Sequence, residues 1–245
     1  MDRIPDRIAG KSVGEIVTAD YRTASVFTRY GIDFCCGGQK PIEQATEEAG
    51  VSLETLLRDL DDVEKEPGVA ERYDQWTPDF LADYVVNQFH TYTRNVMPGI
   101  LEYAATVANV HGDTHPETRV IAALWPKVQG ELVMHMQKEE LLLFPYIKRL
   151  VRSEAEGNTP APPPFGSAED LIQQMEAEHD DTGDALAEIE QRSGGYAIPD
   201  DACATYKALY SMLREFDEAT KKHVHLENNI LFPKTIRLER SLRAV

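Results

Sequence analysis

Two stretches of this chain repeat one pattern of ionisable and apolar residues. "HMQKEELLLFPYIKRL" begins at His135, and "HVHLENNILFPKTIRL" begins at His223. Each has a glutamate four residues after its histidine, Glu139 or Glu227, and each reaches Leu-Phe-Pro at the same offset. A repeat that preserves both kinds of residue indicates two copies of one structural unit.

A further histidine stands upstream of each copy. His90 precedes the first copy and His179 precedes the second, at nearly the same distance. Residues i and i+4 lie on one face of a helix, so each histidine points the same way as its glutamate. That face is predicted to be the core face, because it also carries Val86, Met97, Val128, Leu132, Leu142, Tyr146, Ile172, Met175, Leu186, Phe216, Thr220 and Ile230.

Long helical patterns carry these residues. The sequence predicts helices over about 79–110, 116–152, 167–192 and 200–240, joined by segments rich in glycine or proline. Four long helices with such connections predict an antiparallel four-helix bundle over residues 77–245. No strand-like alternation of useful length appears, so the fold class is all-α.

A small helical domain is predicted over residues 1–66, before the bundle. Ser12 and Glu15 have the form of a capping box. A later helix is expected to begin at Pro41 and to end at Gly50. The polar stretch "KEPGVAERYDQW" is a candidate linker between this domain and the bundle.

The composition describes a globular chain with an acidic surface. It has 245 residues, 42% of them hydrophobic, and a net charge of −17. Such a surface repels phosphate backbones and anionic lipid, so nucleic acid and membranes are not expected partners. No apolar run is long enough for a membrane span, and "MDRIPDRIAG" has no signal-peptide core. Three cysteines form no disulfide framework, so we expect a cytoplasmic protein.

Two carboxylates among four histidines in one core require positive charge. Burying an unpaired carboxylate is costly, and a pair of divalent or trivalent metal ions would supply the missing charge. A single histidine–glutamate pair could instead be a satisfied core pair, but the duplication favours metal. Imidazole and carboxylate ligands suit iron, manganese or zinc, and we expect iron because it is redox-active.

The vicinal pair Cys35–Cys36 lies in "GIDFCCGGQKP". Adjacent cysteines close only a strained ring, so a stable disulfide is not expected, and they do not easily chelate one metal. They could be a buried, inert pair. Lys40 and the helix start at Pro41 would instead favour thiolate. This predicts a reactive site, on a mobile domain tethered by residues 65–76, that could hold iron, nitric oxide or a persulfide transiently.

At "FCCGG", "HMQKEELLLFP", "EAEHDDTGDAL" and "HVHLENNILFP" the chain resembles the hemerythrin-like cation-binding family. Within that family it is most similar to the repair-of-iron-centres (RIC) proteins, which join a hemerythrin-like bundle to an N-terminal helical domain with a vicinal cysteine pair. The resemblance implies two non-haem iron ions, oxo- and carboxylate-bridged, with two histidines on each iron and both glutamates bridging. The implied ligands are the six residues of the repeat: His90, His135, Glu139, His179, His223 and Glu227.

The resemblance also implies a function. Such proteins are linked to the recovery of iron–sulfur clusters damaged by nitric oxide or peroxide, through iron donation, nitric oxide handling or both. Damaged iron–sulfur proteins are then the expected partners, nitric oxide or oxygen is the small ligand, and the family suggests a homodimer. Two alternatives stay open: an oxygen or nitric oxide binding and sensing module, which would need no cysteine pair, and a nitric oxide reductase. Ferritin-like storage is not expected, because a single bundle has no mineral cavity.

Three further histidines are expected to have smaller roles than the six residues of the repeat. His225 lies about 200° around the helix from His223 and should face away from the metals. His111 is either a surface loop histidine or part of an entry path for iron. His115 is expected to be solvated.

Three residues beside the ligands are expected to support the site indirectly. Glu140 should lie behind the ligands or at the surface, because it is turned about 100° from Glu139. Pro145 and Pro233 fall inside apparent helices, and each is expected to bend or end its helix.

Overall fold

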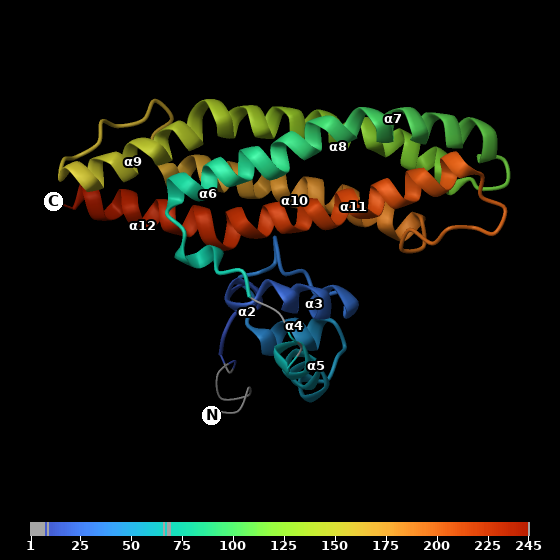
Figure 1. The fold of residues 1–245 in the computed structure, drawn as a ribbon, viewed down its shortest axis with the longest axis horizontal. Helices are drawn as coiled ribbons and strands as arrows, with labels where there is room; N and C mark the ends of the chain where they lie inside the picture. The colour runs from blue at the N-terminus through green and yellow to red at the C-terminus, as the bar shows by residue number, and fades with distance from the viewer. Residues whose placement is uncertain (1–7, 9, 66, 68–69, 245) are drawn as a thin grey trace.

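The computed structural model of the protein describes residues 8, 10–65, 67 and 70–244. The start of the predicted N-terminal domain, residues 1–7 and 9, and residue 66 at its end lie outside these described residues. A long helical bundle dominates the structure, and a small group of helices packs against the middle of its length (Figure 1). Within the described ranges the β-structure is limited to one isolated bridge, between Ser12 and Pro41. The predicted all-α class is confirmed.

Among the described residues, consecutive helices of the bundle join end to end into four rods, and these rods run in alternating directions (Figure 1). This arrangement confirms the antiparallel four-helix bundle. In chain order the rods are α6 (Pro78–Val85), η3 (Val86–His90) and α7 (Thr91–His111); α8 (Glu117–Lys138), η4 (Glu139–Leu143) and α9 (Phe144–Glu156); α10 (Ala168–Arg192); and α11 (Ala204–Leu226), η5 (Glu227–Leu231) and α12 (Phe232–Arg243).

A π-helical turn, η4, interrupts the second rod. There the N–H of Phe144 donates to the carbonyl of Glu139, five residues back. Pro145 follows at once; it has no N–H, and its ring would clash with the preceding turn of a regular helix. The wider turn accommodates the proline, and α9 continues to Glu156. The rod therefore does not end at the proline, one of the two outcomes that the sequence suggested.

One residue within η4 does not lie on the face where helical spacing places it. Leu142, predicted on the core face, is 38% exposed, whereas Leu143 is fully buried. The fourth rod has the same device before Pro233, because the N–H of Phe232 donates to the carbonyl of Glu227 in η5. The prediction for Leu142 is thus wrong, whereas Ile230, at the same position of η5, is 3% exposed and lies on the core face as predicted.

Two apolar clusters fill the bundle along its length. Met175 on α10 belongs to one cluster and Ala185 on α10 belongs to the other. His179 lies between them on the same helix, so the candidate ligands occupy the section that separates the two clusters. Trp125 anchors the second cluster; it is fully buried, and its Nε1 donates to the carbonyl of Met97 at 3.2 Å.

The helices before the linker pack around a third apolar cluster that includes Phe27 and Leu56. The capping box is confirmed, because Glu15 N donates to Ser12 Oγ at 3.2 Å and Ser12 N donates to Glu15 Oε2 at 2.8 Å. Gly50 ends α4 with a φ of 67°. These elements are α2 (Val13–Ala19), η1 (Tyr21–Thr23), α3 (Ala24–Arg29), α4 (Ile42–Glu48) and α5 (Leu53–Lys65), with η2 (Tyr73–Gln75) leading into the bundle.

We expect Trp125→Ala to lower the free energy of unfolding by about 3–5 kcal/mol, because it leaves a cavity in the second cluster and removes a buried hydrogen bond. Met134→Ala is the control, since Met134 is 56% exposed, and it should change stability by no more than about 0.5 kcal/mol. Urea unfolding followed by circular dichroism measures both. Equal losses for the two variants would contradict the assigned core.

Candidate metal centre

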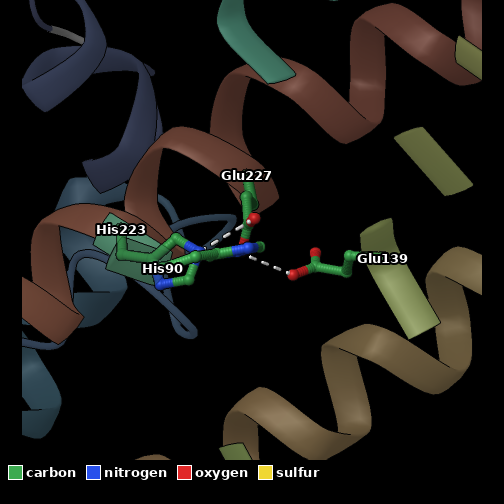
Figure 2. Close-up of side chains that lie close together, drawn as sticks. All are labelled: His90, Glu139, His223 and Glu227. Atoms are coloured by element: carbon green, nitrogen blue, oxygen red, sulfur yellow. Dashed lines mark hydrogen bonds and ion pairs between the residues drawn. The ribbon is translucent and has the colours of Figure 1, made fainter. Parts of the chain in front are cut away.

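The structure brings the six side chains of the repeat together as two groups that share their glutamates. Within each group the candidate ligand atoms all lie within 4.8 Å of one another. The groups are His90, Glu139, His223 and Glu227, and His135, Glu139, His179 and Glu227. Figure 2 shows the first group, in which the imidazoles point toward the carboxylates from different rods.

The Nε2 atom of each histidine faces one of the shared carboxylates. All six residues are at most 3% exposed, so water does little to balance the charges of their side chains. The separations from Nε2 to the nearer carboxylate oxygen are 3.2 Å (His90 to Glu139), 3.3 Å (His135 to Glu139), 3.2 Å (His179 to Glu227) and 3.0 Å (His223 to Glu227).

Several polar atoms at this centre are buried without a hydrogen bond to any described residue. They are Nε2 of His90, both carboxylate oxygens of Glu139 and Oε2 of Glu227. An unsatisfied buried group of this kind costs roughly 1–3 kcal/mol. Cations between the carboxylates and the imidazoles would satisfy all of them, and this donor set suits iron, manganese or zinc. The residues present therefore fit a metal centre.

Two of the imidazoles are held from behind by glutamates. Nδ1 of His90 lies 2.7 Å from Oε1 of Glu140, and Nδ1 of His135 lies 3.0 Å from Oε2 of Glu178. Arg94 in turn donates to Glu140 at 2.6 Å. Such contacts fix the ring orientation and leave Nε2 free for a metal. Glu140 therefore lies behind the ligands, which is one of the two positions predicted for it; the other was the surface.

A third imidazole is held by an amide. Nδ1 of His179 lies 2.8 Å from Oδ1 of Asn228, the residue after Glu227. Neither Asn228 nor Glu178 was predicted from the sequence. Each stands directly beside a candidate ligand in the chain, and that adjacency is the signal that could have found them.

Electrostatics keep the buried carboxylates ionised. Burial alone would raise the pKa of Glu227, but His223 and His179 hold it well below its ordinary value. Burial also opposes the charge on His135, yet the neighbouring carboxylates, Glu139 first, raise its pKa to about 10. Without metal, protons on imidazoles therefore balance the carboxylates, and metal binding must release them.

The cysteine pair is docked against the bundle beside this centre. Asn229 Nδ2 donates to the carbonyl oxygens of Phe34 at 3.1 Å and of Cys35 at 3.3 Å. A cavity of about 590 Å³ lies here, lined by Cys35 and Cys36 on one side and by His179 on the other. The structure thus shows the pair beside one half of the centre.

The surroundings of the pair differ from those that the sequence indicated. Lys40 Nζ lies 2.7 Å from a carboxylate oxygen of Glu48, so its charge is already balanced. Asp33 instead accepts hydrogen bonds from the backbone N–H groups of Cys35 and Cys36. The hydrogen bond with Cys36, burial and the charge of Asp33 together raise the pKa of Cys35 well above its ordinary value. The predicted thiolate is therefore wrong for Cys35.

Asp33 also completes a third group of candidate ligands. Its carboxylate and the sulfur atoms of Cys35 and Cys36 all lie within 4.8 Å of one another. Adjacent cysteines alone are not expected to chelate one metal easily. The aspartate two residues before Cys35 offers a third donor, which the sequence pattern did not indicate.

His225 faces the N-terminal helices, as its angle around the helix predicts. Its ring lies 5.7 Å from that of Tyr21 and 5.8 Å from that of Phe34. Burial lowers its pKa to about 4. His225 is therefore a neutral contact residue between the two parts of the molecule.

His111 and His115 lie near the end of the first rod, away from the six residues. His111 Nε2 lies 3.2 Å from the sulfur of Cys203. His115 is half-buried and pairs with Asp201 at 3.0 Å and Glu117 at 3.2 Å. His115 therefore keeps part of its surface exposed, as expected, and it is paired with two carboxylates that the sequence did not indicate.

Comparison with known proteins assigns the chain to a family. The model of the hemerythrin HHE cation binding domain matches residues 81–235, and a domain of unknown function (DUF542) matches residues 9–64. The iron-sulfur cluster repair protein YtfE of Yersinia pseudotuberculosis serotype O:1b (strain IP 31758) is 34% identical over 229 residues, 94% of this chain and 98% of that protein. YtfE of Yersinia pestis (strain Pestoides F) is 33% identical over the same share. The chain belongs to the hemerythrin-like family of iron–sulfur cluster repair proteins.

The family match covers both regions that the sequence singled out. The hemerythrin-like model includes all six residues of the centre, and the N-terminal model includes the cysteine pair. None of the helices in the described residues is long and apolar enough to cross a membrane.

We expect iodoacetamide at pH 7.5 to label Cys35 at least about tenfold more slowly than the exposed Cys203, because a protonated thiol is a poor nucleophile. Asp33→Asn removes the adjacent negative charge and should speed the labelling of Cys35. Site-resolved mass spectrometry measures both rates. Labelling of Cys35 as fast as that of Cys203 would contradict the raised pKa.

Proposed function

We propose that this chain repairs or protects iron–sulfur clusters damaged by nitrosative or oxidative stress, with two non-haem iron ions as its resident cofactor. The observation that carries the proposal is the pair of buried ligand groups that share Glu139 and Glu227. Relatives that match nearly the whole chain are named iron-sulfur cluster repair proteins, which supports the same role here. Iron donation and nitric oxide handling are both compatible with this site.

In this proposal each iron takes two histidines, and both glutamates bridge. One iron would bind His90 and His223, and the other would bind His135 and His179, with an oxo bridge between them. Iron held in this way supplies one-electron chemistry and a coordination position for a small molecule such as nitric oxide or oxygen.

The chain contributes orientation and exclusion of water. Glu140, Glu178 and Asn228 fix three imidazoles with their Nε2 atoms toward the centre. The rings of Phe144 and Phe232 stack against His90 and His179, respectively, and cover them with apolar surface. Ligand geometry is thus set before any cation arrives, which reduces the reorganisation needed for binding.

We assign the cysteine pair to the transfer of what the centre binds or releases. The support is the cavity that Cys35 and Cys36 share with His179. The thiol of Cys35 is protonated at rest, so a cation entering beside Asp33 would be needed to favour thiolate. The partners would be damaged iron–sulfur proteins, and a cytoplasmic location and a homodimer remain predictions.

Protein expressed with iron should contain two iron ions per chain. His135→Ala removes one ligand and should lower the content toward one, whereas His115→Ala, a histidine remote from the centre, should leave it unchanged. Mass-spectrometric metal analysis gives the stoichiometry. A content well below two in the parent protein, with no oxo-bridge absorption bands, would contradict the two-iron centre.

The cysteine pair separates repair from the alternatives. Cys35→Ser/Cys36→Ser should keep its iron but lose most of the ability to restore a [4Fe–4S] dehydratase inactivated by nitric oxide, while Cys203→Ser should act like the parent. Recovery of dehydratase activity in extracts is the readout. Full repair by the double variant would contradict the role given to the cysteine pair, loss of repair by the parent would favour a binding and sensing module, and nitrous oxide among the products would favour a nitric oxide reductase.

A further inference from the structure

The loop between α3 and α4 holds three potential metal ligands outside the histidine–glutamate centre. They are the carboxylate of Asp33 and the sulfur atoms of Cys35 and Cys36, which all lie within 4.8 Å of one another. Two sulfur donors and one carboxylate are a set that zinc and similar thiophilic cations accept. Because the set contains no imidazole, it would select a different class of cation from the centre in the bundle.

The backbone of the loop fixes the side chain of Asp33. Its Oδ1 accepts hydrogen bonds from the N–H groups of Cys35 at 2.9 Å and of Cys36 at 3.1 Å, and its Oδ2 accepts one from Gly37 at 2.7 Å. These bonds turn the chain so that both cysteines lie beside the carboxylate. A carboxylate has about four acceptor sites, so Oδ2 can still bind a cation.

The two thiols already have nearly the spacing that a bound cation requires. Sγ of Cys35 donates to Oδ1 of Asp33 at 3.2 Å, and it also hydrogen-bonds with the thiol of Cys36. A tetrahedral site with bonds of about 2.0–2.3 Å separates its ligand atoms by roughly 3.3–3.8 Å. Small side-chain movements would therefore be enough for binding, and the two thiol protons would pass to water as the cation takes their place.

Contacts with the bundle and with α2 hold the loop in this form. Nδ2 of Asn229 donates to the carbonyl oxygens of Phe34 at 3.1 Å and of Cys35 at 3.3 Å. On the other side of the cysteines, the N–H of Gly14 donates to the carbonyl of Gly38 at 2.7 Å. The three donors are thus arranged before a cation arrives, which lowers the cost of ordering them on binding.

The cavity that these three side chains line carries an excess of negative charge. Its described walls also include the carboxylates of Asp180, Asp184, Glu190 and Asp217, against the ammonium group of Lys221. Nζ of Lys221 lies 2.7 Å from Asp217 and 3.3 Å from Glu190, so its charge is already paired. Asp180 and Asp184 are exposed, and they make the cavity attractive to a cation and repulsive to an anion.

We propose that Asp33, Cys35 and Cys36 form a separate three-ligand site for one thiophilic divalent cation of the zinc class. Three protein ligands leave a fourth tetrahedral position to water or to an incoming donor. All three residues line the same cavity, so that position is reached from the cavity. The site does not depend on the proposed repair function, because none of its ligands belongs to the histidine–glutamate centre.

Titration of the iron-loaded full chain with cadmium(II) tests the site. Cadmium prefers sulfur and undergoes no redox change, and its bonds to thiolate absorb in the ultraviolet. The protein is kept reduced and carries Cys203→Ser, so that the exposed third thiol does not contribute. We expect one cadmium ion per chain together with a thiolate-to-cadmium absorption band. Absence of the band would overturn the proposal.

Two aspartate variants distinguish ligation from general attraction of cations. Asp33→Asn should weaken cadmium binding by at least about tenfold, because even residues that only support a metal ligand contribute that much. Asp184→Asn is the matched control, since it removes the same charge from the same cavity but no ligand. It should change the affinity by less than about threefold, as expected of an exposed charge that salt screens. Equal losses in the two variants would overturn ligation by Asp33.

Cys36→Ser tests the second sulfur and leaves the bonds from Asp33 to the backbone in place. It should also weaken cadmium binding by at least about tenfold, and it serves as the deciding variant if Asp33→Asn does not fold. Unchanged affinity in Cys36→Ser would overturn the site. Iron content, measured on the same samples, reports the two-iron centre independently. Cadmium bound by histidine and glutamate gives no thiolate band, so the two proposals can fail separately.

Discussion

Two fully buried carboxylates that face the same four imidazoles determine most of this structure. Glu139 and Glu227 have no exposed surface, and three of their four oxygens lack a hydrogen bond to any described residue. Carboxylates in such a place must be balanced by cations or by protons on their neighbours. The bundle provides for both, because the same Nε2 atoms can carry protons or bind metal. Metal binding and proton release are therefore coupled at this centre.

A π turn of the backbone begins at each of these two buried carboxylates. In the second and fourth rods a glutamate opens the turn and a proline follows it. The wider turn lets the rod continue past the proline, and in the fourth rod it also directs two asparagines toward the N-terminal helices. One local departure from regular helix therefore serves the ligand, its support and the docking of the cysteine loop.

Much of this arrangement could be predicted from the sequence, because repeats and helical spacing report which side chains share a face. The duplicated histidine–glutamate pattern selected the residues that converge, and the capping signals located the N-terminal helices. The failures concern the surroundings of single side chains, which repeats and helical spacing do not report. Leu142 is exposed although helical spacing places it on the core face, and the pKa of Cys35 is raised by its hydrogen bond with Cys36, by burial and by the charge of Asp33. The division at residues 66 and 77 remains a prediction.

The most direct test of the account is the position of iron itself. A crystal structure of the iron-loaded protein, with anomalous diffraction recorded at the iron absorption edge, locates each ion independently of any activity. The account predicts two peaks about 3.5 Å apart, one bound by His90 and His223 and the other by His135 and His179, with Glu139 and Glu227 between them. A single peak, or iron held elsewhere in the chain, would contradict it.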